Sequence, residues 1–480
     1  MPIKRVALLP DAVVNSRAKM RPTIMKFGGT SVADAAAFAN GSSIVQAAAH
    51  EQPVVVVSAI AGFTNALLCS VEKANRGDAR VAGRSLDEWF ERHVAIAKAL
   101  VDEEARKPVE SAIDDAKREI RQLLRIIAAY PVTSPPLQDE IVAYGELLSS
   151  RLLAGVLRAN GLRSQYVDAR ECVKTDESYG NAAPLPETAA TTSELLRPLI
   201  EAAAIPVLGG FIGSTQKGET TTLGRGGSDY TAAIVGAALE AREIQIWTDV
   251  SGVLTADPRV VPEAKPIPVL SYQEAAELAY FGAKVLHPKT IQPAIDKSIP
   301  VRVCNSHAPQ DAGTLIVAES DAAPQTIKAI AHKNGIVTVQ VTSARMLGAY
   351  GFLRALFEVF DRHKTAVDVV TTSEVSVSLS IDDASTLPEL ITDLEQLGTV
   401  QIERDRTIVS VVGEGLRNTP GIAARVFSVI SDINVSMISV GASSVNLTFM
   451  VDDAHAAEAI MRLHRVCFEE SAVPTQEVTA

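Results

Sequence analysis

The sequence has little cysteine and no long apolar run. Four cysteines occur in 480 residues, at positions 69, 172, 304 and 467, and no two of them form a CxxC pair. This spacing argues against a zinc site or a disulfide framework, and we expect reduced thiols in a cytoplasmic protein. No run reaches the roughly 18 apolar residues of a membrane span, so no membrane is expected as a partner. Residues 1–22 lack the apolar core and cleavage site of a signal peptide, and we expect a loosely ordered extension.

Positive charge is in deficit. The chain carries 45 Lys and Arg against 57 Asp and Glu, a formal net charge of −12, and its pI is near 5.3. This balance argues against nucleic acid as a partner, and an anionic substrate must be held by a few local cations. Hydrophobic residues make up 47% and charged residues 21%, which is typical of a globular protein. At 480 residues the chain is too long for one core, so we expect roughly two to four domains.

Short apolar runs alternate with helical segments in the N-terminal part of the chain. The runs are each followed by small polar residues, and they occupy residues 23–27, 53–57, 205–211 and 243–248. The helical segments occupy residues 33–49, 85–128, 139–160 and 270–286. This alternation predicts an α/β fold with a mostly parallel sheet between helices, in which ligands bind at the carboxyl ends of strands.

The stretch KGETTTLGRGGSDYTAA at residues 217–233 concentrates the residue types of an anion site. Its glycines at 224, 226 and 227 let backbone N–H groups approach a ligand closely, and Arg225 offers a planar fork for a carboxylate or phosphate. Ser228 and Asp229 are predicted N-caps of the helix that follows. A helix that begins behind a glycine turn binds anions through its free N–H groups. We therefore predict a ligand site here, with an ordinary strand-to-helix loop as the alternative.

A second glycine turn, KFGGTS at residues 26–31, indicates phosphate chemistry. The sequence has no Walker A motif and no HRD or DFG motif, which excludes those two ATP-binding folds. Lys26 is a compact cation suited to phosphate oxygens, although a solvated lysine at a strand end fits the sequence equally well. Phosphoryl transfer needs mainly positioning and charge neutralisation, so lysines, backbone N–H groups and Mg²⁺ would suffice.

An internal repeat occupies the C-terminal part. Residues 351–383 align without gaps with residues 421–453, and pairs such as Phe357/Phe427 coincide. Each copy is predicted to form a β-α-β-β-α unit, which a final strand would complete as a ferredoxin-like module. Two such sheets are expected to pair edge to edge and to leave an effector crevice between them. A polar, proline-containing linker is predicted before the repeat, at residues 319–334.

Several motifs together resemble one family. KFGGTSVAD, YGELLSSRLL, GRGGSDYTAA, WTDVSGVLTADPR and FGAKVLHPKT occur in this order. With the repeat, they make the chain similar to aspartokinase over about residues 23–475, and most similar to its monofunctional, lysine-sensitive branch. The resemblance implies an amino-acid-kinase domain at 23–318, with a mostly parallel sheet sandwiched by helices. It also implies two α+β ferredoxin-like ACT domains, at 335–405 and 406–475.

The resemblance implies ATP-dependent phosphorylation of the β-carboxylate of L-aspartate, with Mg²⁺, on the route to lysine, threonine and methionine. Lys26 and Asp229 are implied to be catalytic. The implied aspartate ligands are Thr64, Glu146, Arg225, Ser228 and Asp229. The implied ATP ligands are Lys26, Gly28, Gly29, Ser31, Thr248, Asp249, Leu254, Arg259 and Lys284. Many relatives have Tyr where Leu254 stands, and no carboxylate cluster identifies metal ligands, so Mg²⁺ is expected to rest chiefly on phosphates and water.

The two repeats differ at residues suited to an amino acid effector. Asp368 and Glu374 of the first copy become Ile438 and Ser444 in the second. Acidic groups suit the ammonium groups of lysine, so we expect the first copy to bind the effector and the second to be structural. The implied effector ligands are Met346, Ala349, Phe352, Leu353, Val367, Asp368, Thr372, Ser373 and Glu374. Ala349 replaces a serine of the lysine-sensitive pattern, which leaves threonine, or lysine with threonine, as alternatives.

The resemblance also implies a homodimer formed through the ACT domains, with a tetramer as the alternative. In such a dimer, effector binding would favour an inactive state.

Two other functions compete with an aspartate kinase. One is another amino-acid kinase, acting on glutamate or a nucleotide monophosphate, and the repeat and the GELLSS motif argue against it. The other is a non-catalytic amino-acid sensor, and the retained Lys26, Glu146, Arg225 and Asp229 argue against that.

Overall fold

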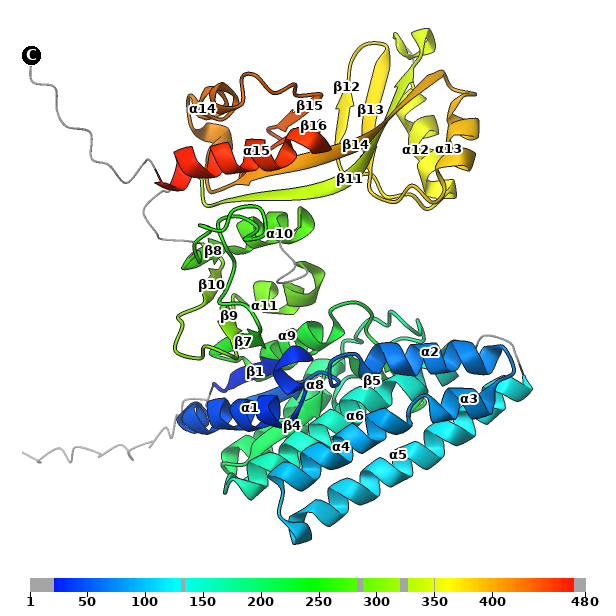
Figure 1. The fold of residues 1–480 in the computed structure, drawn as a ribbon, viewed down its shortest axis with the longest axis vertical. Helices are drawn as coiled ribbons and strands as arrows, with labels where there is room; N and C mark the ends of the chain where they lie inside the picture. The colour runs from blue at the N-terminus through cyan, green and yellow to red at the C-terminus, as the bar shows by residue number, and fades with distance from the viewer. Residues whose placement is uncertain (1–20, 131–133, 283–287, 320–326, 349, 470–480) are drawn as a thin grey trace, which may run out of the picture.

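The computed structural model describes residues 21–130, 134–282, 288–319, 327–348 and 350–469. Figure 1 shows two parts, a helix-covered sheet in the lower half of the view and a smaller sheet with its own helices in the upper half. No described helix is long and apolar enough to cross a membrane. The predicted N-terminal extension lies outside the described residues except for Arg21 and Pro22. Arg21 donates from Nε to the carbonyl oxygen of Glu240 over 2.9 Å.

An eight-stranded sheet, in the order β3-β4-β2-β1-β7-β9-β10-β8, forms the first part. Neighbouring strands run parallel except β9 and β10, which confirms the predicted sheet type. The runs predicted as buried strands form its centre, because their side chains meet helices on both faces. Its strands are β1 (Thr23–Phe27), β2 (Val54–Val57), β3 (Ser164–Val167), β4 (Ile205–Gly209), β7 (Glu243–Thr248), β8 (Val269–Ser271), β9 (Val301–Asn305) and β10 (Thr314–Val317). A hairpin of β5 (Ile212–Ser214) and β6 (Thr220–Thr222) follows β4.

Helices cover both faces of this sheet. α6 contacts β2, β3 and β4 on one face, and α9 contacts β1, β2 and β7 on the other. Helices α1, α2, α4 and α5 contact α6, and helices α8 and α11 contact α9. α6 is buried along most of its length because the outer helices cover its remaining side. The helices are α1 (Ala35–Ala47), α2 (Phe63–Asn75), α3 (Ala79–Arg84), α4 (Asp87–Leu100), α5 (Glu103–Ala129), α6 (Pro135–Ala159), α7 (Ala169–Cys172), α8 (Thr188–Glu201), α9 (Gly227–Leu239), α10 (Tyr272–Tyr280) and α11 (Gln292–Asp296).

The helical segment predicted at 85–128 is two helices. Val101 is extended between α4 and α5, and the carboxylate of Asp102 caps α5 by accepting from the backbone N–H of Ala105 over 3.0 Å. The sequence prediction missed this break, because an Asp cap between two amphipathic helices leaves the helical spacing nearly unchanged.

A six-stranded antiparallel sheet, in the order β12-β13-β11-β14-β16-β15, contains both repeats. Its strands are β11 (Ala329–Thr342), β12 (Val370–Thr372), β13 (Ser376–Ile381), β14 (Thr399–Val412), β15 (Met437–Val440) and β16 (Asn446–Asp452). Helices α12 (Phe352–Arg362) and α13 (Leu387–Leu394) belong to the first repeat, and α14 (Ile422–Val429) and α15 (Asp453–His464) to the second.

The two repeats share strands instead of pairing edge to edge as expected. β11 and β14, each 14 residues long, run through both halves of the sheet. Residues 329–333 pair with 408–412 in the half of the second repeat, and 338–342 pair with 399–403 in the half of the first. The strand that completes the second unit therefore precedes the first repeat in sequence. The predicted linker at 319–334 is corrected, since β11 begins at Ala329 within it.

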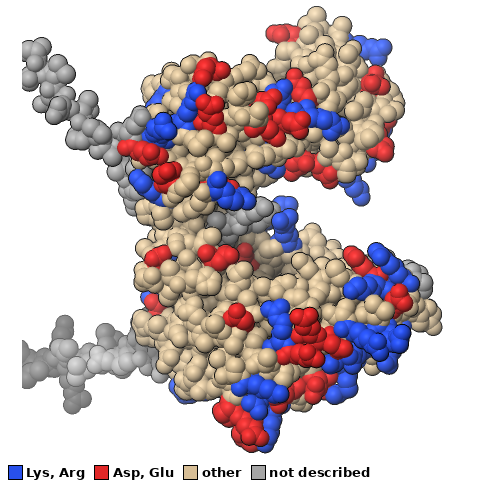
Figure 2. Space-filling view, viewed as in Figure 1, with Lys and Arg blue, Asp and Glu red and all other residues tan. Residues whose placement is uncertain are grey.

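Helix α10 and the start of β11 join the two parts. α10 contacts β11 and β14, and the carboxylate of its Glu277 accepts from Nδ2 of Asn446 over 2.7 Å. A buried ion pair of 2.8 Å joins Glu274 to Lys328. Figure 2 shows the two parts meeting on one side of the view and separating on the other, where an open notch lies between them. The junction thus has polar contacts and apolar ones, because buried Leu278 and Phe281 of the lower part share an apolar core with Ala331 of the upper sheet. The segment after β7 contributes as well, since the carbonyl of Thr255 accepts from the N–H of Ile330 over 2.8 Å.

Candidate active site

A cavity of about 540 Å³ lies beside the carboxyl ends of β1, β2 and β4. This is the position that a parallel sheet predicts for a ligand. The cavity is within the range of small-molecule sites. Its lining includes the predicted residues Lys26, Gly29, Thr64, Glu146, Arg225, Ser228 and Asp229. Segments more than 200 residues apart in the chain therefore meet here, as the motif order implied.

Lys26 and Asp229 form the charged centre of the cavity. Lys26 Nζ lies 2.6 Å from Asp229 Oδ1, and the two side chains are 11% and 15% exposed. Lys26 is the fourth residue of β1, and Asp229 lies in the first turn of α9, so strand and helix hold the pair rigidly. The pair places one cation, already oriented by a carboxylate, at the mouth of the glycine turn.

Glu146 is a buried carboxylate without a full set of partners. The residue is 3% exposed, and its Oε1 accepts from the backbone N–H of Ala59 over 3.2 Å. No hydrogen bond from a described residue reaches its Oε2. Burial raises the pKa of Glu146 to about 8, although the N–H of Ala59 and the charge of Lys26 oppose this. A buried, unpaired carboxylate oxygen in a cavity is suited to a ligand cation.

Arg225 stands between two glycines whose backbone conformation other residues rarely adopt. Gly224 and Gly226 have φ angles of +74° and +72°. A Cβ atom on Gly224 would also lie 2.5 Å from Asn181 Oδ1. α9 begins at Gly227 with Gly226 as its N-cap, so Ser228 and Asp229 lie in its first turn and are not caps as predicted. Arg225 itself is exposed at the cavity edge.

Of the two glycines in the turn at residues 26–31, one lines the cavity. Gly29 lines the cavity, and a Cβ atom there would lie 3.1 Å from the carbonyl oxygen of Ala59. The N–H of Gly28, an implied ATP ligand, donates within the protein to the carbonyl oxygen of Trp247 over 3.0 Å. Ser31 is 2% exposed and its hydroxyl lies 2.8 Å from that of Ser306, so it supports the turn from below.

The other predicted ATP ligands lie outside this cavity. Thr248 ends β7, the strand beside β1, and its hydroxyl donates to Asp249 over 3.1 Å. Leu254 is half-buried, and Arg259 is 82% exposed and paired with Asp257 at 2.6 Å. Lys284 lies outside the described residues. Thr248 and Asp249 thus neighbour the glycine turn, while Arg259 is held away from it.

The predicted effector residues fall into two groups. Met346 lies near the β12–β13 turn that carries Ser373 and Glu374, because the N–H of Met346 donates to the carbonyl of Ser343 and the N–H of Ser343 to that of Val375. Thr372 ends β12 at this turn, and Phe352 packs on the core of the first repeat. Leu353 is 42% exposed on α12 beside Phe352, and Val367 packs on the core of the first repeat. Ala349 lies outside the described residues.

Asp368 forms the second group. Its side chain is 2% exposed and faces α10, where it accepts from the hydroxyl of Tyr280 and pairs with Lys333 at 3.0 Å. It precedes Thr372 by four residues, about 13 Å in an extended chain. The described residues therefore do not gather all predicted effector ligands at one place within a single chain.

Asp139 is a cavity residue that the sequence analysis missed. It lies two helical turns before Glu146 on the same face of α6, and it is 2% exposed. The spacing of seven residues from a predicted ligand on a helix was the available signal.

The arrangement is that of an amino-acid kinase. The family model for the amino acid kinase family matches residues 21–305, and one for an ACT domain matches residues 409–466. The lysine-sensitive aspartokinase 3 of Escherichia coli (strain K12) is 40% identical over 465 residues, 93% of this chain and 99% of that protein. Two solved structures of E. coli aspartokinase III are 38% identical and cover 93% of this chain and all of theirs. The complex with aspartate and ADP (R-state) has a TM-score of 0.78, and the complex with lysine and aspartate (T-state) has 0.80.

Sheet, cavity and family model define the class as an amino-acid kinase with C-terminal ACT-type units. Within that class the chain belongs to the aspartokinase family, the ATP-dependent aspartate kinases.

Proposed function

We propose that this chain transfers the γ-phosphoryl group of ATP to the β-carboxylate of L-aspartate in the cavity at Lys26. One observation carries the proposal: the free Oε2 of Glu146 lies in the same cavity as the cations Lys26 and Arg225. Aspartate has one ammonium and two carboxylates. A buried carboxylate with two separate cations complements that charge pattern.

The nucleophile needs no general base. The β-carboxylate of aspartate has a pKa near 3.9 in water and is ionised at pH 7. In the proposal, Arg225 binds the α-carboxylate, Glu146 binds the α-ammonium, and Thr64 and Ser228 complete the aspartate site. Lys26 stabilises the negative charge of the transferring phosphoryl group, and Asp229 orients Lys26 through their ion pair.

Mg²⁺ is proposed to arrive with ATP. Among the described residues, no group of three or more His, Cys, Asp or Glu side chains could hold a metal ion. The oxygens of Thr248 and Asp249 at the end of β7 fit a metal whose other ligands are phosphates and water. When bound, Mg²⁺ would neutralise charge on the β- and γ-phosphates.

A hydroxamate assay tests the reaction. Hydroxylamine traps an acyl phosphate as a hydroxamate, so the protein with Mg²⁺-ATP and L-aspartate should give a coloured product. Omitting aspartate is the control, and L-glutamate in its place separates the proposal from a glutamate kinase. No signal with aspartate, or an equal signal with glutamate, would contradict it.

We propose lysine as the effector, bound by the first repeat. Glu374 is exposed on the β12–β13 turn, and Asp368 is 2% exposed at α10. Because about 13 Å separates the two ends of this strand segment, a site that uses both acids needs a second copy of the chain to complete it. Exposed apolar side chains at this end of the molecule, Leu353, Phe357, Val370 and Val375, support a homodimer through the first repeats.

Asp368 would connect this effector site to the kinase part. In this structure its carboxylate is occupied by Tyr280 of α10 and by Lys333. An ammonium group of lysine bound at Asp368 would compete with Lys333 and weaken the contact with Tyr280. The loss of that contact would change how α10 packs under the upper sheet, and so favour a less active state.

Two substitutions test this assignment. Asp368→Ala and Glu374→Ala should each weaken lysine inhibition about tenfold or more. Glu374→Ala should keep the activity measured without lysine, whereas Asp368→Ala, which also removes the contact with Tyr280, should lower it. Asp382→Ala is the matched control, because Asp382 also pairs with Lys333, at 2.7 Å, but is not a predicted effector ligand. Unchanged inhibition in the two variants would refute the assignment, and stronger inhibition by threonine would identify another effector.

A homodimer and a cytoplasmic location stay proposals. Light scattering would give the mass in solution, with a tetramer as the alternative outcome. The four cysteines, all described and all free, are consistent with a reducing compartment.

A further inference from the structure

Asp139 is a further carboxylate residue of the cavity lining, besides Glu146 and Asp229, and its hydrogen bonds differ from those of Glu146. Its Oδ2 accepts from the backbone N–H groups of Gly180 and Thr222, both over 2.8 Å. Its Oδ1 accepts from the hydroxyl of Thr222 over 3.0 Å. Both oxygens of Asp139 are therefore engaged, whereas Oε2 of Glu146 is not. Burial raises the pKa of Asp139, and its three hydrogen bonds oppose that rise.

The partners of Asp139 lead directly to Arg225. Thr222 is the last residue of β6 and precedes Arg225 by three positions. Its carbonyl accepts from the N–H of Ala182 over 2.9 Å, so residues 180–182 and β6 are joined to each other as well as to α6. Asn181, beside Gly180, contacts Gly224, where a side chain would collide with it.

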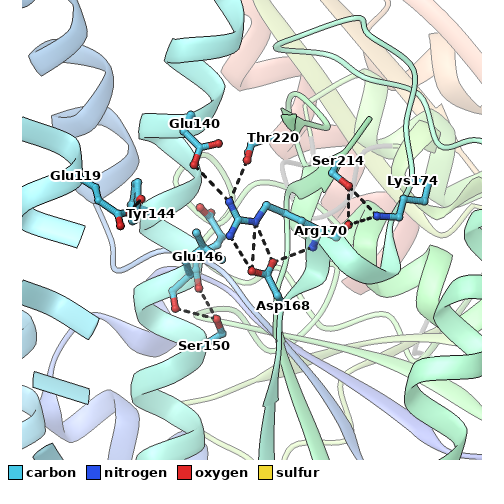
Figure 3. Close-up of polar contacts among 11 residues, drawn as sticks. Glu119, Glu140, Tyr144, Glu146, Ser150, Asp168, Arg170, Lys174, Ser214 and Thr220 are labelled. Atoms are coloured by element: carbon cyan, nitrogen blue, oxygen red, sulfur yellow. Dashed lines mark hydrogen bonds and ion pairs between the residues drawn. The ribbon is translucent and has the colours of Figure 1, made fainter. Parts of the chain in front are cut away.

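The neighbouring residue on α6 holds the same hairpin from another side. Figure 3 shows Arg170 between Glu140 of α6 and Thr220 of β6. Arg170 lies 3.5 Å from the Glu140 carboxylate, donates to the Thr220 hydroxyl over 3.0 Å, and pairs with Asp168 at 2.8 Å. Two consecutive residues of the rigid helix α6 thus fix both ends of β6.

We propose that Asp139 is a positioning residue for aspartate binding, which fixes the loop of Arg225 relative to Glu146. Helix α6 carries both Asp139 and Glu146, so one rigid element sets the distance between the group proposed for the ammonium and the group proposed for the α-carboxylate. Arg225 sits on an exposed glycine-flanked loop that has little rigidity of its own. The inference rests on the proposed function, because it assumes that Arg225 binds the substrate.

Single variants give the first test. Asp139→Ala leaves two backbone N–H groups without an acceptor, and we expect KM for aspartate to rise about 10-fold or more with KM for ATP nearly unchanged. Asp139→Asn should stay close to wild type, because its oxygen can accept from both N–H groups and the Thr222 hydroxyl can turn to accept from its amide. Asp176→Ala is the matched control: Asp176 accepts from the N–H groups of Ser178 and Ala183 in the same loop, outside the cavity lining.

A double variant keeps the test decisive if Asp139→Ala does not fold. Thr222→Val removes the hydroxyl and keeps the backbone N–H and the shape. In Asp139→Asn/Thr222→Val the amide faces a methyl group and loses its partner. The fold increase in KM for aspartate over wild type should therefore be at least three times the product of the fold increases in the two single variants. Additive effects, or equal changes in KM for aspartate and ATP, would overturn the inference. If the wild-type protein shows no aspartate-dependent turnover in the same assay, the proposed function fails instead.

Discussion

The amino acid side and the nucleotide side of the site differ in how far they are built before any ligand binds. On the amino acid side, Glu146 and Asp139 are 3% and 2% exposed, so both carboxyl groups are buried before any ligand binds. On the nucleotide side, Asp249 is exposed and Arg259 is 82% exposed and paired with Asp257. A small zwitterion must be recognised by charges held in place by the protein, because it has few other groups to bind. A nucleotide brings its own phosphates and metal, so it can complete a looser site.

The largest effect should come from Lys26→Ala. Removal of the cation that faces the phosphoryl group should lower kcat about 100- to 1,000-fold, with smaller changes in either KM. Steady-state kinetics in both substrates measures this. Lys217→Ala is the control, because Lys217 is 70% exposed and pairs with Glu177 outside the cavity lining. A kcat within threefold of wild type would show that Lys26 is not at the reacting centre.

Arg225→Ala should affect the amino acid side alone. Loss of charge-assisted hydrogen bonds to the α-carboxylate should raise KM for aspartate roughly 10- to 100-fold. KM for ATP should change less than threefold, and calorimetric binding of ATP should be unaltered. An equal rise in KM for both substrates would contradict the contrast between the two sides. The loop of Arg225 would then be a general anion site that does not distinguish aspartate from ATP.

The pH dependence of aspartate use should follow Glu146. Its pKa of about 8 means that the free protein holds a proton on Glu146 at pH 7, whereas the ammonium of aspartate requires the carboxylate. KM for aspartate should therefore fall as the pH rises from 6 to 8, by up to about tenfold per pH unit, and level off above 8. Glu146→Gln should raise KM and remove this dependence, and KM for ATP should not follow it.

Protonation of Glu146 weakens aspartate binding but stabilises the folded protein. The folded pKa lies above the value of 4.5 for an unperturbed Glu, so the folded state holds the proton more tightly. This contribution is present below pH 4.5 and is lost as the pH rises to about 8. The difference in Tm between Glu146→Gln and wild type should therefore depend on pH. The variant should gain stability relative to wild type between pH 5 and pH 8, and should be the more stable of the two near pH 8.

The smallest effect should come from Arg259→Ala. An exposed arginine paired with a surface carboxylate contributes little, so KM for ATP should rise only about two- to fivefold and KM for aspartate should not change. A rise of 50-fold or more would mean that the nucleotide side closes around ATP and is as specific as the amino acid side.

The sequence was sufficient for those parts of the fold that depend on local patterns. Fully apolar runs at 53–57 and 243–248 predicted central strands, and the glycine-containing stretches at 26–31 and 217–233 predicted the cavity. The motifs of the resemblance identified Lys26, Glu146, Arg225 and Asp229, which the structure brings together.

Long-range pairing explains what the sequence analysis missed. Asp139 accepts hydrogen bonds from backbone N–H groups that lie 41 and 83 positions away in sequence. From the sequence alone it resembles any solvated acid near the start of a helix. The shared strand β11 was assigned partly to a linker, because its partner for residues 329–333 lies in the other repeat. Asp368 was expected to bind an effector, but its carboxylate already accepts a hydrogen bond from the hydroxyl of Tyr280, which lies 88 positions away in sequence.

Calorimetric titration of the nucleotide-free protein with L-aspartate tests the central claim most directly. The account holds that the amino acid side is formed without ATP and that Glu146 must lose its proton to bind the ammonium. Aspartate should therefore bind alone at pH 7 and release about one proton, seen as a heat that varies with the ionisation enthalpy of the buffer. Glu146→Gln should release none. Binding that needs ATP, or a heat independent of the buffer in the wild-type protein, would contradict the account.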